Sequence, residues 1–169
     1  MKNLIKTLSI LMLLALVGLD ACKKDDPKPA VTTCDGTLSA TMNSALFTGA
    51  TFNNTLLKSS GAKRMDIRAT DSKGRQVIIT FNDLSSGTTG NGVSTDAYIP
   101  VDDISTGTEN TFFFTIIDNS VSDIITSGSL DITSCNADTK KVSGTFSFSD
   151  GDYVVTAGTF TNLCYTIIQ

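Results

Sequence analysis

The chain has 169 residues, enough for one domain of ordinary size. Its formal net charge is -4, so it lacks the excess of Lys and Arg that neutralises nucleic-acid phosphates, and we expect no nucleic-acid partner. Histidine is absent, which excludes Ser–His and Cys–His catalytic pairs and zinc sites ligated by histidine.

The first 21 residues have the three parts of a secretory signal peptide. Lys2 and Lys6 give a positive start, and small Ala21 precedes Cys22. Between them lies an apolar run of about a dozen residues, shorter than the roughly 20 that span a bilayer. We therefore expect residues 1–21 to be removed. The alternatives are an uncleaved membrane anchor or a buried helix.

Leu19-Asp20-Ala21-Cys22 resembles a lipobox, although Asp20 replaces the commoner small uncharged residue. The resemblance implies that Cys22 is lipidated after cleavage. Acyl chains then supply membrane affinity at about 0.8 kcal/mol per buried CH₂. The following Lys23-Lys24-Asp25-Asp26 resembles the export tag of Bacteroidota surface lipoproteins, or is simply a hydrophilic spacer. The resemblances imply lipid anchoring at the outer membrane, on the cell surface.

Residues 22–33 comprise the lipidation site and a charged segment that contains two prolines. This composition favours a flexible tether. Residues 34–169 then form the folded domain.

The domain shows a period of two in apolar and polar residues, which is typical of half-buried strands. The alternation starts at Thr37, at Arg64 and at Gln76. The turn Asp71-Ser72-Lys73-Gly74 between the last two predicts a hairpin. We find no helical period after Cys22.

Residues 84–110 are irregular and rich in small polar residues, with a strand-like piece only at 97–101. Long irregular connections in compact domains are either functional or mobile. Tyr98 is the candidate aromatic platform for a ligand such as a sugar here, since the chain contains no tryptophan.

Residues 112–117 are apolar on both faces of the predicted strand, which indicates a central strand covered on both sides. The last forty residues predict a meander, with strands in 129–133 and 142–148 and further strands after the turn Asp150-Gly151-Asp152.

This C-terminal part carries a family resemblance. Residues 128–133 (GSLDIT), 142–148 (VSGTFSF) and 158–160 (GTF), with an opening strand such as 38–43 (LSATMN), resemble a family of small Bacteroidota lipoproteins of unknown function. The resemblance implies an all-β lipoprotein and carries no activity with it.

The predicted fold is an all-β sandwich or partly closed β-barrel of about eight to ten antiparallel strands. The predicted core consists of Met65, Ile67, Val77, Ile79, Phe81, Phe112, Phe114, Ile116, Leu130, Ile132, Phe146, Phe148 and Phe160.

Paired aspartates are the remaining candidates for chemistry. Asp102 and Asp103 are neighbours and would point to opposite faces of a strand, so they make a poor catalytic pair. Asp150 and Asp152 fit a hairpin turn. Calcium takes six to eight oxygens, which these four residues and Asp118 would supply if their loops met. The competing explanation is that turns favour aspartate.

Of the four cysteines, Cys22 is assigned to lipid, and an oxidising compartment favours one disulfide among the other three. We favour Cys135–Cys164, because both lie in the C-terminal meander. Cys34 reaches the final strand instead if the termini pair. No Cys-x-x-Cys motif is present, which argues against redox catalysis.

We therefore expect no enzyme activity and no cofactor. The first functional hypothesis is a lipid-anchored surface module that binds glycan, protein or calcium. The second is an envelope-structural lipoprotein with no small-molecule ligand.

Overall fold

The computed structural model describes residues 34–59, 62–84, 90–102, 110–119 and 121–169. In this part the chain forms twelve strands and no helix, so the all-β prediction is confirmed. No helix there is long and apolar enough to cross a membrane. The strands are β1 (Thr37–Met42), β2 (Ala45–Phe52), β3 (Thr55–Ser59), β4 (Ala62–Asp71), β5 (Gln76–Asp83), β6 (Ala97–Pro100), β7 (Thr111–Asp118), β8 (Val121–Ile125), β9 (Ser129–Asn136), β10 (Lys141–Ser149), β11 (Val154–Cys164) and β12 (Thr166–Ile168).

The predicted hairpin is β4–β5, and the predicted meander is β9–β10–β11. The expected count of eight to ten strands was too low. The additional strands include β3, β6, β8 and β12, which have three to five residues each. Such short strands are defined by their pairing partners, because they are too short to carry a clear alternation.

The strands pair in the order β12-β3-β4-β2-β1-β11-β10-β9-β6-β7-β5. Because β5 also pairs with β4, the strands from β4 to β5 along this order close a hydrogen-bonded ring. β8 pairs with β7 outside the ring. The expected antiparallel sheet is in fact mixed, since β12–β3 and β6–β7 are parallel.

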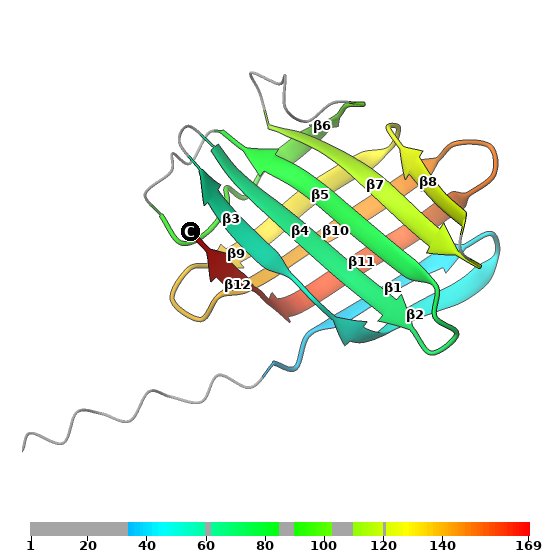
Figure 1. The fold of residues 1–169 in the computed structure, drawn as a ribbon, viewed down its shortest axis with the longest axis horizontal. Helices are drawn as coiled ribbons and strands as arrows, with labels where there is room; N and C mark the ends of the chain where they lie inside the picture. The colour runs from blue at the N-terminus through cyan, green and yellow to red at the C-terminus, as the bar shows by residue number, and fades with distance from the viewer. Residues whose placement is uncertain (1–33, 60–61, 85–89, 103–109, 120) are drawn as a thin grey trace, which may run out of the picture. The chain divides into compact units, whose positions relative to one another are not determined.

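Two layers cross each other in Figure 1. We call β3, β4, β5, β7 and β8 the front layer, and β1, β9, β10 and β11 the rear layer. β2 pairs with β1 and β4, and β6 pairs with β9 and β7, so these two strands connect the layers.

The core lies between the two layers. All thirteen predicted core residues are at most 3% exposed. Phe114 of the front layer packs against Phe148 of the rear layer, with ring centroids 4.3 Å apart. The period-two pattern therefore identified the inward faces correctly, because apolar residues on one face of a strand must be removed from water together.

The repeated Gly-Thr-Phe of β10 and β11 has a packing explanation. Gly144 lies directly opposite Phe160, and Phe146 lies directly opposite Gly158. A Cβ on Gly144 would collide with the Phe160 ring, and one on Gly158 would lie 2.7 Å from the Phe146 ring. Each ring thus covers the glycine of the neighbouring strand, which restores the packing that a glycine alone would lose.

Candidate functional site

The described chain begins at a disulfide. Cys34 is bonded to Cys164, the last residue of β11, with Cα atoms 5.7 Å apart. Lys141 Nζ lies 2.8 Å from Asp35 Oδ1, and Gly36 packs so closely on the backbone of Leu163 that a Cβ would lie 2.7 Å from its Cα. The N-terminal end of the domain is therefore fixed to β10 and β11. Cys22, the predicted lipidation site, and the rest of residues 22–33 lie outside the described residues.

The favoured pairing Cys135–Cys164 was wrong. β10 lies between β9, which carries Cys135, and β11, which carries Cys164. Strands separated by a third are about 10 Å apart, too far for a disulfide. Cys34 can reach Cys164 because β1 pairs with β11. Cys135 is a half-buried free cysteine.

Tyr98 is not a ligand platform. It lies in β6, is 4% exposed and packs its ring edge-on against Phe81, with centroids 4.8 Å apart. Its hydroxyl contacts Ser94 Oγ at 3.2 Å. Burial raises the pKa of Tyr98 above its ordinary value, so the side chain stays neutral. The aromatic residue of the irregular segment is a core residue with a hydrogen-bonded polar end.

A buried ion pair is the main polar feature that sequence analysis missed. Lys63 of β4 and Asp83 of β5 lie opposite each other, are 1% and 0% exposed, and bring Nζ within 3.7 Å of Oδ2. Lys63 Nζ also donates to the Gly92 carbonyl oxygen. Ser94 donates to Asp83 twice, from its backbone N at 2.8 Å and its Oγ at 3.1 Å.

This cluster extends to the beginning of β7. Asn110 Nδ2 lies 3.4 Å from Ser94 Oγ, and Asn110 Oδ1 accepts a bond from the backbone N of Leu84 at 2.9 Å. The cluster therefore fastens residues 90–98 and the start of β7 to the open end of the β4–β5 hairpin. Because these polar groups are bonded to one another, we interpret the cluster as structural.

The sequence did contain a signal for this ion pair. Lys63 is in phase with the core residues Met65 and Ile67, and Asp83 is in phase with Ile79 and Phe81. Two opposite charges at core positions of adjacent strands predict a buried pair once the hairpin register is known.

Cys135 belongs to a second set of polar contacts, which involve the residues on either side of Gly92. Its Sγ accepts from the backbone N of Val93 at 3.3 Å and lies 3.6 Å from the hydroxyl of Tyr165. That hydroxyl donates to the carbonyl oxygen of Asn91. Burial, followed by the contact with Cys135, raises the pKa of Tyr165. These contacts hold residues 91–93 against β9 and the residue before β12.

Two of the predicted calcium ligands, Asp118 and Asp152, line the same surface hollow, together with Asp123. No group of three His, Cys, Asp or Glu side chains in the described part of the chain is placed to hold a metal ion, however, and Asp102 and Asp150 do not line that hollow. Asp103 lies outside the described residues. Asp150 Oδ1 accepts hydrogen bonds from the backbone N of Asp152 at 3.1 Å and of Tyr153 at 2.8 Å. Asp150 therefore stabilises the turn before β11, as aspartate side chains commonly do.

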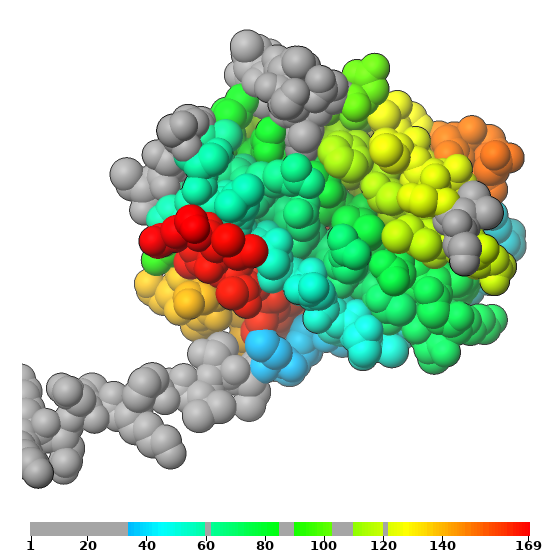
Figure 2. Space-filling view, viewed as in Figure 1, coloured from blue at the N-terminus to red at the C-terminus, as the bar shows by residue number. Residues whose placement is uncertain are grey.

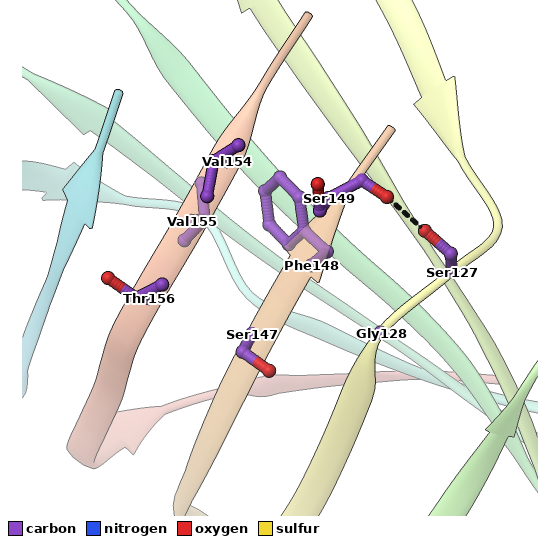
Figure 3. Close-up of a pocket in the computed structure, with 8 residues that line it drawn as sticks. All are labelled: Ser127, Gly128, Ser147, Phe148, Ser149, Val154, Val155 and Thr156. Carbon is purple, nitrogen blue, oxygen red and sulfur yellow. Dashed lines mark hydrogen bonds between the residues drawn. The ribbon is translucent and has the colours of Figure 1, made fainter. Parts of the chain in front are cut away.

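The described residues line at least two surface hollows. The first, of about 270 Å³, is lined by residues of the β8–β9 connection, β10 and β11, and Figure 3 shows Ser127 Oγ directed at the carbonyl oxygen of Ser149 on its rim. The second, of about 400 Å³, is lined by Asn43, Asp118, Asn119, Asp123, Asp152 and Tyr153. The described polar side-chain atoms that are buried without a partner, Gln76 Oε1 and Thr111 Oγ1, belong to neither hollow.

Comparison with known proteins found no match among family models, curated proteins or solved structures. The resemblance to small Bacteroidota lipoproteins therefore stays a prediction from the sequence.

Proposed function

We propose that the chain is an exported lipoprotein, anchored in the outer membrane by acyl chains on Cys22, with residues 34–169 as a non-catalytic binding domain on the cell surface. The observation that carries this proposal is the sequence from Lys2 to Cys22, with its positive start, short apolar run and lipobox-like end. Acyl chains on one cysteine account for the membrane affinity of a β domain.

The disulfide supports the exported location. Cys34 and Cys164 are 130 residues apart in the chain and are joined by a disulfide. Disulfides persist in oxidising compartments but are rare in the cytosol. The disulfide also lies at the place where a tether from Cys22 would meet the domain. Residues 23–33, if extended at about 3.5 Å per residue, would reach about 40 Å from the lipid.

The non-catalytic part of the proposal is supported by the polar clusters. The Lys63–Asp83 pair is 1% and 0% exposed, and it is hydrogen-bonded to Gly92 through Lys63 and to Ser94 through Asp83. A nucleophile or general base must be reachable by its substrate. A buried charged pair of this kind instead holds the segment around Gly92 and Ser94 in place through hydrogen bonds.

The anchor is tested by fractionation of cells that express the full-length protein. Wild type should be recovered in the outer-membrane fraction, with acyl mass on an N-terminal Cys22 and no residues 1–21. Cys22→Ser should accumulate as an unlipidated precursor or a soluble form. Cys135→Ser is the matched control, because it removes a thiol outside the lipobox, and should fractionate as wild type does.

An unmodified Cys22 in the wild-type protein would refute the anchor. Exposure to protease added to intact cells tests the surface location separately. If the protein is protected from protease in intact cells but is cleaved after lysis, the domain lies on the periplasmic side of the outer membrane. That result would favour the envelope-structural alternative.

A further inference from the structure

The outer face of the front layer, which points away from the core, carries charged and apolar side chains together. On β4, the residues between the core positions are Arg64, Asp66 and Arg68. The register places Ile78 of β5 opposite Arg68, and Thr115 of β7 opposite Ile78. Side chains that are opposite each other on paired strands share a face. Figure 2 views the molecule from this side, where β4, β5 and β7 lie toward the viewer.

This face is closely packed although no described layer covers it. Ile78 is 8% exposed and Thr80 is 3% exposed, and neither belongs to the core cluster between the layers. Phe113, opposite Thr80 on β7, is half-buried. The apolar residues on both faces of residues 112–117 predicted a strand that is covered on both sides. The second side of β7 instead carries the half-buried Phe113, and β5 lies between it and the arginines of β4.

The charge on this face is positive on a protein whose net charge is -4. Elsewhere in the described residues, Lys63, Arg75 and Lys141 are each paired with an aspartate. Arg64 lies 3.2 Å from Asp66, but the two side chains are 43% and 33% exposed, so water screens this pair. Arg68 is exposed, and its guanidinium has no ion-pair or hydrogen-bond partner among the described residues.

We propose that this arginine face, defined by Arg64, Arg68, Ile78, Phe113 and Thr115, binds an anionic polysaccharide. The carboxylate or sulfate groups of the polysaccharide would bind the guanidinium of Arg68 and would compete with Asp66 for that of Arg64. A guanidinium offers paired hydrogen-bond donors that match the oxygen atoms of such groups. A sugar ring would lie on Phe113. The inference rests on the binding-module part of the proposed function.

The geometry favours a polysaccharide over an acidic peptide. An extended peptide gains most of its affinity by adding a strand to a free sheet edge, but β4 and β5 are each paired on both sides. Peptide side chains also need pockets, and neither described hollow is lined by residues of the arginine face. An aromatic ring on the same face as two exposed arginines suits a ligand made of sugar rings that carries repeated anions.

The test uses the full-length protein, purified in detergent and immobilised. Dextran sulfate and polygalacturonate are the anionic probes, and unsulfated dextran is the control with a matched backbone. We expect binding of the anionic probes that weakens between 50 and 300 mM salt, and none of dextran. Arg68→Gln should weaken binding about tenfold, as expected for the loss of one charge-assisted contact.

Lys73→Gln is the matched charge control, because Lys73 is an exposed cation in the β4–β5 turn and off the arginine face. It should bind as wild type does, and Phe113→Ala should bind more weakly. Each variant must first show the melting temperature and circular dichroism of the wild type. If Phe113→Ala fails this check, the proposal is judged only on the affinities of Arg68→Gln and Lys73→Gln for the anionic probes.

Three results would overturn the proposal: no binding of either anionic probe, equal losses in Arg68→Gln and Lys73→Gln, or tighter binding of poly-L-glutamate than of both polysaccharides. The last would assign the face to acidic peptides. None of them bears on the lipid anchor, which fractionation of Cys22→Ser tests independently.

Discussion

Cys34 and Cys164 are 130 residues apart in the chain, and their disulfide joins the first described residue to the end of β11. Asn54 Nδ2 donates to the carbonyl oxygen of Cys164 at 2.8 Å, and Asn54 Oδ1 accepts from the backbone N of Arg68 on β4. Cys164 is therefore bonded both to the N-terminal end of the domain and to the front layer. If a lipid on Cys22 holds the protein, tension along residues 23–33 meets this cross-link before it reaches β1.

Removal of this disulfide should lower the free energy of unfolding by about 3–5 kcal/mol. A cross-link that closes a loop of more than 100 residues restricts the unfolded chain strongly in the chain-entropy account. Cys34→Ala/Cys164→Ala should show this loss in urea unfolding without reductant. Wild type should show the same loss when reductant is added.

Cys135→Ala is the control for this experiment, since Cys135 is a free cysteine. It should keep the disulfide, shown by peptide mapping, and should stay sensitive to reductant. A Cys135→Ala protein with no disulfide would contradict the pairing seen here.

The buried ion pair predicts strongly non-additive mutations. Lys63→Met should cost about 3–5 kcal/mol, because it leaves the carboxylate of Asp83 buried without its cation. Lys63→Met/Asp83→Leu should be more stable than Lys63→Met, since no uncompensated charge remains. Urea unfolding of the single and double variants measures this coupling.

Arg64→Met/Asp66→Leu is a comparison pair on the same strand, with both charges partly exposed. Its coupling should be below about 1 kcal/mol. Equal coupling in the two pairs would show that burial does not set the energy of the Lys63–Asp83 interaction.

The sequence was sufficient for the parts of the fold that depend on local alternation. The inward faces of β4, β5, β7, β9 and β10 follow from the period of two, because each strand is long enough to repeat it. In β11 the buried residues are spaced by three, two and three, because its pairing with β10 contains register shifts. The β4–β5 turn followed from Asp71 and Gly74, whose φ of 85° suits glycine.

Features that depend on long-range pairing were not predictable from one sequence. β12 has three residues and is a strand only because Ile168 and its neighbours pair with β3. The pairing of β6 with β7 and β9 buries Tyr98, and the pairing of β1 with β11 brings Cys34 beside Cys164. Cysteine spacing alone could not distinguish the pairings of Cys34, Cys135 and Cys164, because it contains no information on strand order.

Phe114→Ala should cost about 3–5 kcal/mol, because it removes a fully buried ring that contacts Phe112, Phe146 and Phe148. Ile124→Ala is the control on the paired strand β8, where the side chain is 64% exposed, and should change stability by less than about 0.5 kcal/mol. Thermal or urea unfolding measures both. Similar losses in the two variants would mean that the inward and outward faces have been exchanged.

Asp71 should make the β4–β5 hairpin sensitive to acid. Burial opposes ionisation of Asp71, but the side chain of Arg75 and the backbone N–H groups of Arg75 and Lys73 outweigh it, so the pKa of Asp71 lies below its ordinary value of 3.8. The contacts are close, with Arg75 Nη2 at 2.7 Å and Nε at 2.8 Å from Asp71 Oδ2.

The sign of the pH dependence follows from this lowered pKa. Between the folded and the unfolded pKa, the unfolded chain binds more protons at Asp71 than the folded protein does, so stability rises with pH. The contribution is fully present above about pH 4 and is lost as the pH falls below 3.8 toward the folded pKa. Asp71→Asn should cost about 1.5–3 kcal/mol at pH 6, the range for hydrogen bonds to charged groups.

Urea midpoints at pH 6 and pH 3 test this directly. Wild type should lose more stability between the two values than Asp71→Asn, in which no carboxyl at position 71 can be protonated. Arg75→Gln removes the cation that favours the ionised form, so it should also lose less between pH 6 and pH 3 than wild type. If Asp71→Asn lost as much stability on acidification as wild type, the acid sensitivity would have to come from other carboxylates, and Asp71 would have no part in it.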